Sequence, residues 1–539
     1  MTNKLFYGDN LDVLREHVAS ESVDLVYLDP PFNSNANYNI LFKSKTGDGS
    51  DAQIEAFEDT WHWNDKAEDA FDQVMRSGRT GASELLRAMR GFLGDNDMMA
   101  YLAMMAIRLI ELHRVLKGTG SLYLHCDPTA SHYLKLLLDG VFGAENYRNE
   151  IIWKRTSAHA DASRNLAAVH DIIFRYTKTD RAIWNQIYRP YDDAYVAEHF
   201  VHLDPDGRRF RRSDLVSPSV RPNLRYDYTA SNGRTYKAHE NGWKVSRPVM
   251  EQLDRENRLF FPAKEEARLR KKVYFDESPG VPLTDVWDDL RPIHASAAER
   301  LGYPTQKPLS LLERIISASS NEGDVVLDPF CGCGTAVHGA QKLGRQWIGI
   351  DITHLAISLI EKRLKDAFPG IAFEVHGTPK DLASARDLAE RDKYQFQWWA
   401  VSMVDALPFG GKKKGADGGI DGIIYFRPDG KRTEKALVSV KGGGNVSVNM
   451  IRDLHSAMER EKAPIGVFIT AALPTRPMEA EAAGVGRFES EVTGRTYPRL
   501  QIITLAELFQ GRKPDIPYVD PASVKRAKRE ETGRQERLI

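Results

Sequence analysis

The sequence predicts an α/β protein built on a parallel sheet, followed by a smaller α/β domain. Three observations predict this fold class. Short apolar, β-branched runs at 23–32 and 120–127 end in turn or polar residues, with an amphipathic helical pattern between them. A run at 325–335 passes through a glycine-rich turn into a helical pattern, and another strand-like run follows at 345–352. Strands that alternate with helices favour a parallel sheet, because each parallel connection needs a crossover.

The composition indicates a multidomain protein of the cell interior. A chain of 539 residues with 42% hydrophobic residues is too long for one ordinary core and can fill two or three. The net charge of −1 does not mark the whole chain as a nucleic-acid binder, but a local basic patch would suffice. With three cysteines and no apolar signal core, we expect a reducing cytoplasm. No stretch is apolar enough to predict a membrane span.

Periodicity and composition divide the chain into six segments, which are 1–178, 179–295, 296–370, 371–393, 394–513 and 514–539. The first and third carry the strand–helix alternation. The second is rich in Arg, Lys, Tyr and Pro and has poor periodicity, so we expect an inserted module. The fourth has mixed charge and predicts a linker helix. The fifth contains strand-like runs of its own, which predict a separate domain, and the sixth is a polar tail.

A ligand site is predicted at the glycine-rich turn. Gly332 and Gly334 lie directly after an apolar strand, where glycine allows a sharp turn and a close approach to a ligand. The next strand ends at Asp351, whose carboxylate can accept hydrogen bonds from ribose hydroxyls. The alternative is a tight turn with no ligand. A dinucleotide site is disfavoured, because Val337 stands where the third glycine of that pattern falls.

A second site is predicted at the end of the first long strand, at Asp29, Pro30, Pro31 and Phe32. Asp29 and the rigidly held carbonyl of Pro30 offer two acceptors for an NH₂ group, and Phe32 offers a stacking face for a planar base. Accepting hydrogen bonds from an amino nitrogen draws its lone pair out of ring conjugation, which makes the nitrogen a better nucleophile. Taken alone, the tetrapeptide is equally an ordinary turn, since Asp-Pro and Pro-Pro are common turn formers.

Four motifs occur together in a defined order: GD at 8–9, LDPPFN at 28–33, YPTQKP at 303–308 and DPFCGCGT at 328–335. The combination resembles the β group of DNA amino-methyltransferases, in which the catalytic motif precedes the cofactor motif and a target-recognition domain lies between them. The resemblance covers about residues 1–370. It is strongest to the methyltransferases of type II and type III restriction systems.

The resemblance implies a permuted Rossmann-like class I methyltransferase sheet, with its catalytic half at 1–178, its cofactor half at 296–370 and a DNA-binding recognition module at 179–295. It implies a site-specific DNA methyltransferase that transfers a methyl group from S-adenosylmethionine to the exocyclic amino group of a flipped base. DPPF rather than SPPY favours N6 of adenine, and N4 of cytosine stays the alternative.

C5 methylation of cytosine is disfavoured on chemical grounds. That reaction uses a cysteine nucleophile that conventionally follows a proline, whereas Cys126 follows His125 and Cys331 follows Phe330. Cys331 and Cys333 are also a poor zinc pair, because no second pair of ligands lies nearby.

The resemblance also assigns roles to single residues. Asp29, Pro30, Pro31 and Phe32 would hold the base. Residues in 328–335 would surround the methionine part of the cofactor, Asp351 would bind its ribose, and Asp9 with the loop at 305–308 would close the pocket. The full cofactor set is Asp9, Thr305, Gln306, Lys307, Asp328, Pro329, Phe330, Gly332, Gly334, Thr335 and Asp351.

The inserted module carries the expected contacts to double-stranded DNA. Its arginines, lysines and tyrosines fit phosphate contacts and stacking, and its densest basic run contains Arg208, Arg209, Arg211 and Arg212. The same run would equally serve as a solvated surface. A homodimer and a separate restriction subunit both stay open as protein partners. The expected setting is the prokaryotic cytoplasm, at the nucleoid.

The fifth segment has a motif of its own. A carboxylate at Asp421 begins one strand and Lys441 lies in the next, which is the layout of PD-(D/E)xK nucleases and resembles the Mrr-type restriction endonucleases. Asp421 would hold Mg²⁺, and Lys441 would position the attacking water. Ser439 replaces the usual Glu or Gln, and a hydroxyl is a weak metal ligand. Two interpretations of this domain therefore stay open: it gives a bifunctional enzyme with Mg²⁺-dependent endonuclease activity, or it is a nuclease-like fold kept for DNA binding or dimerisation. For the whole chain, a catalytically silent DNA-binding protein also stays open, and so does RNA as the substrate.

Overall fold

A computed structural model describes residues 2–31, 37–41, 53–58, 63–156, 166–264, 267–294, 297, 299–301, 303, 305–409, 419–429, 432–491 and 494–517, with only the backbone at 37–41 and 53–58. Phe32 and the tail from 518 onwards lie outside the described residues. Two compact units are present: residues 186–283 form one, and the parts of the chain before and after them form the other. Within the described ranges, none of the helices has the length and apolar character that a membrane crossing requires.

The larger unit is built on a nine-stranded sheet. From one edge to the other, its strands are β16 (Val286–Trp287), β6 (Tyr147–Lys154), β7 (His170–Thr177), β5 (Leu116–Cys126), β2 (Val23–Leu28), β17 (Val325–Asp328), β18 (Gln346–Asp351), β1 (Lys4–Tyr7) and β19 (Glu374–His376). The six strands from β5 to β19 run parallel, and β7 runs antiparallel to both of its neighbours. The predicted α/β class is confirmed, and β2 and β17 lie side by side although almost 300 residues separate them.

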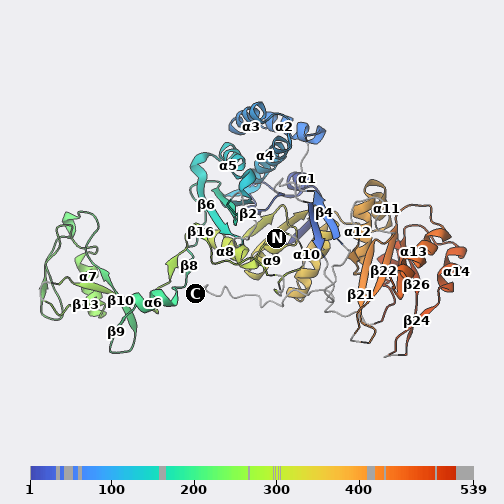
Figure 1. Cartoon of the computed structure of the whole chain (residues 1–539). Coiled ribbons are helices and arrows are strands. Elements are labelled where there is room, and N and C mark those ends of the chain that lie inside the picture. Colours follow the sequence, from blue (N-terminus) through green and yellow to red (C-terminus); the bar gives the residue numbers. More distant parts are fainter. Residues whose placement is uncertain are drawn as a thin grey trace. The chain divides into compact units, whose positions relative to one another are not determined.

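Helices pack against this sheet. Figure 1 shows one group beside the sheet, formed by α2 (Asp65–Arg76), α3 (Thr80–Leu93), α4 (Asp97–Val115) and α5 (Pro128–Phe142). The remaining helices of this part are α1 (Asn10–His17), η1 (Ala144–Asn146), α8 (Leu309–Ser319), α9 (Thr335–Lys342) and α10 (His354–Ala367). A separate pair of strands, β3 (Asn37–Leu41) and β4 (Gln53–Glu58), is antiparallel. Local sequence sets the helix ends: the Asp127 side chain caps α5, and Pro128 opens it.

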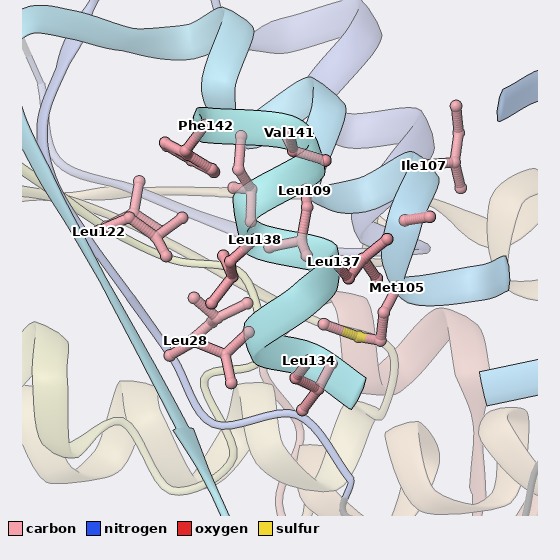
Figure 2. Packing of buried hydrophobic residues seen from close by; sticks show 14 of the residues in the cluster. Leu28, Met105, Ile107, Leu109, Leu122, Leu134, Leu137, Leu138, Val141 and Phe142 are labelled. Atoms are coloured by element: carbon pink, nitrogen blue, oxygen red, sulfur yellow. The ribbon is translucent and has the colours of Figure 1, made fainter. Parts of the chain in front are cut away.

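The core of the larger unit lies between the sheet and the helices α4 and α5. Figure 2 shows Leu28 and Leu122, from adjacent strands, facing Leu138 of α5. All three side chains are fully buried, as is Leu109 on α4. The packing fixes β2 and β5 against their helices, so the loops that leave the carboxyl ends of these strands start from rigid positions.

The smaller unit, 186–283, is an irregular, mostly antiparallel module. Its central sheet has the order β13 (Leu259–Phe260), β14 (Arg270–Tyr274), β10 (Arg209–Asp214) and β9 (His202–Leu203). Its other elements are β8 (Tyr188–Arg189), α6 (Asp193–His199), η2 (Pro222–Leu224), β11 (Tyr228–Thr229), β12 (Thr235–Tyr236), α7 (Arg247–Arg255) and β15 (Val281–Pro282). An aromatic cluster around Trp243 and Met250 gives it a core of its own.

The C-terminal residues form a five-stranded sheet covered by helices. Its strands are β20 (Leu407–Pro408), β21 (Gly422–Phe426), β22 (Glu434–Lys441), β23 (Ile465–Thr470) and β26 (Leu500–Thr504), and β22, β23 and β26 run parallel. The helices are α11 (Leu382–Arg391), α12 (Lys393–Met403), α13 (Val448–Arg460), α14 (Arg476–Gly484) and α15 (Leu505–Phe509), and a hairpin joins β24 (Arg487–Glu489) to β25 (Thr496–Pro498). Apolar clusters cover both faces of this sheet.

The segment 371–393, expected as a linker, is part of both folded regions. Its strand β19 extends the main sheet beside β1, and its helix α11 buries Leu388 and Ala389 in the C-terminal core. Its mixed charge reflects the exposed face of α11, whereas the buried face is short and easily overlooked in the sequence.

Candidate active site

A cavity of about 350 Å³ opens at the carboxyl edge of the main sheet, where β1, β2, β17 and β18 end. Ligands of open α/β sheets bind at this edge, where neighbouring connections leave in opposite directions. Predicted site residues that line the cavity are Asp9, Asp29, Pro30, Pro31, Thr305, Lys307, Asp328, Pro329, Phe330, Gly332, Thr335 and Asp351. Lining residues that the sequence did not reveal include Asn10, Tyr27, Lys66, Met104, Arg108 and Thr353.

The turn between β17 and α9 requires glycine at two positions. Gly332 and Gly334 have φ angles of +52° and +74°, in the left-handed region that other residues rarely adopt. A Cβ atom at Gly334 would lie 2.7 Å from Cγ1 of Ile360, and one at Gly332 would lie 3.1 Å from the ring of Tyr303. Gly334 itself does not line the cavity; it allows the chain to turn into α9 against α10.

Asp351 holds this turn in place. Its Oδ2 atom accepts a hydrogen bond of 2.9 Å from the backbone N–H of Gly332, and its Oδ1 atom accepts from the backbone and hydroxyl of Thr353. Burial raises the pKa of Asp351 to about 6, although these donors oppose the shift. The carboxylate is therefore both a structural anchor and an acceptor at the cavity wall.

Asp328, at the end of β17, has a different environment. Its side chain is buried, and Oδ1 accepts from the backbone N–H of Phe330 at 3.0 Å. Burial raises its pKa well above the ordinary value, and the nearby carboxylates of Asp29 and Asp351 add to the shift. Tyr303 is also buried beside the turn.

The N-terminal segment closes the cavity through a buried arginine. Arg108 on α4 donates from Nη2 to both carboxylate oxygens of Asp9, at 2.8 and 3.1 Å, and from Nε to Oδ1 of Asn10 at 2.6 Å. Asn10 in turn donates to the carbonyl of Pro329 at 2.9 Å. The sequence offered one sign of this contact. Arg108 is the only arginine in the apolar run 97–110, and a buried charge needs a partner.

A second buried arginine supports the glycine-rich turn from behind. Arg363 on α10 donates from Nη1 to the carbonyl of Cys333 at 3.0 Å and to the hydroxyl of Thr335 at 3.1 Å. The turn is therefore fixed on one side by Asp351 and on the other by Arg363.

The predicted base-site residues line the same cavity from the end of β2, which β17 separates from β18. Asp29, Pro30 and Pro31 all line it, directly after β2. The ammonium group of Lys307 lies 2.5 Å from Oδ2 of Asp29, and both side chains are largely buried. The sequence assigned Lys307 to the cofactor set, but its contact is with the carboxylate of the predicted base site.

Gln306 does not line the cavity. Its amide donates to the carbonyl of Glu299 at 2.6 Å, and its oxygen accepts from the N–H of Leu301 at 2.8 Å. Through these two hydrogen bonds, Gln306 fixes its own loop. Thr305 and Lys307 face the cavity instead.

The four arginines of the predicted DNA surface do not have equal surroundings. Arg208 is paired with Asp276 and Glu277 at 2.8 and 2.6 Å, so its charge is already compensated. Arg209 and Arg212 are exposed on β10, and Arg212 lies over the ring of Phe260. Their exposure leaves these two side chains accessible.

In the C-terminal domain, the predicted nuclease residues share one region of the sheet. Asp421 lies opposite Ser439, since the next pair in register is Gly422 with Val438. Its Oδ2 atom accepts from the backbone N–H of Val440 at 2.6 Å and lies 3.5 Å from the hydroxyl of Ser439. Lys441 is two residues further along, on the same face as Ser439. Among the residues that the structure describes, no group of three or more His, Cys, Asp or Glu side chains could hold a metal ion.

Comparison with known proteins decides the family. A DNA methylase family model matches residues 23–362, which is more than half of the chain. The chain belongs to the DNA methylase family. A restriction endonuclease model also matches residues 388–494 of this DNA methylase, which agrees with the Mrr-type resemblance of its C-terminal domain.

Individual relatives of this DNA methylase come from restriction-modification systems. Type II methyltransferase M.EcaI of Enterobacter cloacae is 28% identical over 368 residues, which cover 67% of this chain and 69% of the relative. The Mod subunit of the type III enzyme StyLTI of Salmonella typhimurium is 27% identical over 64% of this chain and 50% of the relative. Among solved structures, the putative DNA modification methylase TTHA0409 of Thermus thermophilus covers 70% of this chain and 100% of its own, at 17% identity and a TM-score of 0.34.

The glycine requirement gives a first prediction. We expect Gly334→Ala to destabilise the methylase by more than Gly370→Ala, as measured by thermal denaturation of the full chain. Both glycines have positive φ angles, which cost alanine about 1–2 kcal/mol. Only at Gly334 does the added Cβ also collide with a packed side chain, because nothing lies within 4 Å of the corresponding position at Gly370. Equal losses in the two variants would contradict the predicted close approach.

Proposed function

We propose that this DNA methylase transfers the methyl group of S-adenosylmethionine to N6 of adenine in double-stranded DNA. The single observation that carries the proposal is one cavity lined both by Asp29, Pro30 and Pro31 and by Asp351 and the glycine-rich turn. Asp29 and the prolines suit an amino group. Asp351 and the glycine-rich turn suit a nucleoside with a short charged chain.

The residues present fit S-adenosylmethionine. Asp351 offers a carboxylate to ribose hydroxyls at the end of β18, and Gly332 leaves room for the ligand because it has no side chain. The cofactor supplies an electrophilic methyl group on a positively charged sulfur. Above a pH of about 6 the Asp351 carboxylate on the cavity wall is ionised, and its negative charge suits this positive centre.

The base wall acts by orienting the amino group. A carboxylate oxygen of Asp29 and the carbonyl of Pro30 accept its two hydrogens, so that the nitrogen lone pair points toward the methyl group. Lys307, 2.5 Å from Asp29, fixes the carboxylate and compensates its charge. Proximity and orientation of this kind contribute a large part of the rate in transfers between two bound partners. Asp29 rather than Ser at this position supports adenine over cytosine.

We further place the enzyme in a restriction-modification system of the prokaryotic cytoplasm, on nucleoid DNA. The recognition module at 186–283 would contact the duplex through exposed basic residues such as Arg209 and Arg212. A restriction subunit is the protein partner that the likeness to type III Mod subunits supports.

The central test is the loss of transfer in Asp29→Ala. We expect incorporation of labelled methyl groups into DNA to fall by about 10²–10³-fold or more, because a hydrogen bond made in the transition state is lost. S-adenosylmethionine binding, measured by calorimetry, should change little. The matched control is Asp127→Ala at the end of the neighbouring strand, which removes a helix cap worth about 1 kcal/mol. Retained transfer in Asp29→Ala would refute the assigned role.

The identity of the modified base is tested on the wild-type protein. Modification-sensitive sequencing of DNA from cells that express the full chain should detect N6-methyladenine in one sequence context. N4-methylcytosine would overturn the adenine assignment while leaving the amino-methyltransferase proposal intact.

The raised pKa of Asp351 predicts how cofactor binding depends on pH. Below a pH of about 6, protonation removes the charge that accepts hydrogen bonds from the ribose. We therefore expect the dissociation constant of S-adenosylmethionine to rise as the pH falls from 7.5 to 5.5. Asp351→Asn, which is neutral throughout, should bind weakly and lose this part of the dependence. An unchanged wild-type dissociation constant over this range would contradict the prediction.

A second candidate function, Mg²⁺-dependent cleavage of DNA, is favoured by the shared face of Asp421 and Lys441. The hydrogen bond that Asp421 accepts from Val440 and the serine at 439 weigh against it. The candidate predicts that the full chain with Mg²⁺ cuts unmethylated DNA, that Lys441→Ala does not, and that Lys435→Ala on the same strand does. Lys435 is a suitable control because it pairs with Glu461. Intact DNA with the wild type would exclude the candidate.

A further inference from the structure

A buried chain of hydrogen bonds begins at the cavity wall and crosses three strands of the sheet. Tyr27 on β2 lines the cavity, and its hydroxyl oxygen lies 2.9 Å from Nδ1 of His125 on β5. Nε2 of His125 lies 3.1 Å from Oδ2 of Asp171 on β7. Nε of Arg155, which follows β6, lies 3.1 Å from the other oxygen of Asp171. Tyr27, His125 and Asp171 are each at most 3% exposed.

The sheet register places this chain beside the predicted base site. Tyr27 pairs with Tyr123 in the parallel ladder of β2 and β5, so His125 lies two residues further along, level with Asp29. Asp171 lies at the start of the antiparallel strand β7, at the same edge of the sheet. The chain therefore ends where β2 passes into its catalytic turn.

The partners determine where the protons are. Burial alone would raise the pKa of Asp171, but His125, Lys307 and Arg155 together hold that pKa below its usual value. An ionised carboxylate only accepts hydrogen bonds, so Nε2 of His125 is protonated and donates a hydrogen bond to Asp171. Nδ1 is then an acceptor, and the hydroxyl of Tyr27 donates to it. The phenol oxygen keeps its lone pairs for a donor in the cavity.

Stability alone gives no reason for this arrangement. Buried ionic groups gain little over well-packed apolar residues, because desolvation offsets their attraction. Fully satisfied buried networks do, however, hold polar groups in one geometry. The feature that this network holds in place is the oriented phenol of Tyr27, a residue that lines the cavity.

We propose that Tyr27, His125 and Asp171 form a proton-accepting chain for the methyl transfer. The inference rests on the proposed function, since it concerns the amino group that the cavity would bind. Tyr27 would touch the substrate, and His125 and Asp171 act through it as positioning residues.

Methyl transfer forms one bond and breaks another. The amino nitrogen forms a bond to the methyl carbon while the carbon–sulfur bond breaks, and its electron pair returns to sulfur, which becomes neutral. The nitrogen then carries one proton too many. That proton passes to the oxygen of Tyr27 as the phenol proton passes to Nδ1 of His125, and Asp171 stabilises the imidazolium. After the product leaves, the same path in reverse returns the proton to water in the cavity.

The chain offers a matched pair of variants. Tyr123 is opposite Tyr27 in the ladder and is equally buried, and its hydroxyl lies 2.7 Å from that of Ser319. Unlike Tyr27, it is absent from the cavity wall. Tyr27→Phe and Tyr123→Phe thus each remove one buried hydroxyl and one hydrogen bond, but only the first removes the proposed acceptor.

We expect the single-turnover rate of methyl transfer to fall about 10²-fold in Tyr27→Phe and less than threefold in Tyr123→Phe, in line with the usual contribution of general acid–base groups. The dissociation constants of S-adenosylmethionine and DNA should stay within about twofold in both. Equal rates in the two variants would overturn the inference. No transfer by the wild type would instead overturn the proposed function, so the two failures are distinguishable.

A second readout does not depend on activity. In ¹⁵N-histidine NMR spectra of the full chain, the signals of His125 are identified as those lost in His125→Gln. We expect Tyr27→Phe to shift the Nδ1 resonance, because that nitrogen loses its donor, and Tyr123→Phe to leave it in place. An unshifted Nδ1 resonance in Tyr27→Phe would show that the phenol does not donate to His125 and would overturn the proton chain.

Discussion

The carboxylate of Asp351 is the point on which the cavity depends. One oxygen holds the N–H of Gly332, the other holds Thr353 at the start of α10, and the carbonyl of the same residue accepts from the N–H of Gly8 after β1. Three connections that leave the sheet at its carboxyl edge are thereby tied to one residue. A carboxylate can do this because it accepts several hydrogen bonds at once, whereas burying it without such donors would be costly.

The same logic explains how two distant parts of the chain make one site. At the amino end of β17, the buried carboxylate of Asp24 on β2 accepts from the N–H of Val325 and from Lys117. At the carboxyl end, Asn10 donates to the carbonyl of Pro329. Polar contacts at both ends therefore fix β2 and its neighbours against the cofactor strand, while the apolar core holds the strands between them. The order of the motifs in the sequence matters little once this ladder has formed.

The sequence reveals those parts of the structure that depend on local pattern. Strands at 23–28, 325–328 and 346–351 were predictable because short apolar runs end in turn residues, and the glycines at 332 and 334 were predictable because their backbone requirement is local. Contacts between side chains far apart in the sequence were not predictable. Lys307 contacts Asp29 from 278 positions away, and Arg108 reaches Asp9 from a helix 99 positions away.

Two of the predicted site residues have side-chain partners that the sequence did not indicate. Gln306 was grouped with its neighbours, but its side chain hydrogen-bonds to Glu299 and Leu301 of its own loop. Arg208 was counted as a DNA contact, and Asp276 and Glu277 compensate its charge. The segment 371–393 reads as a linker because its apolar residues are few, yet Ala385, Leu388 and Ala389 enter the C-terminal core. Composition reports which side chains are present, but only tertiary structure determines their partners.

The carboxylates around the cavity fall into two groups, which differ in the donors that hold them. On the base side, Asp29 has the ammonium of Lys307 and Asp171 has the guanidinium of Arg155, so these carboxylates carry compensated charge and can orient neutral groups. On the cofactor side, Asp328 and Asp351 are held by backbone N–H groups, which carry no full charge. Under the proposed function, the ionised Asp351 would attract the sulfonium centre of S-adenosylmethionine, and the base would meet fixed acceptors at Asp29 and Pro30. Electrophile and nucleophile would then be held by different residues of one cavity before any bond forms.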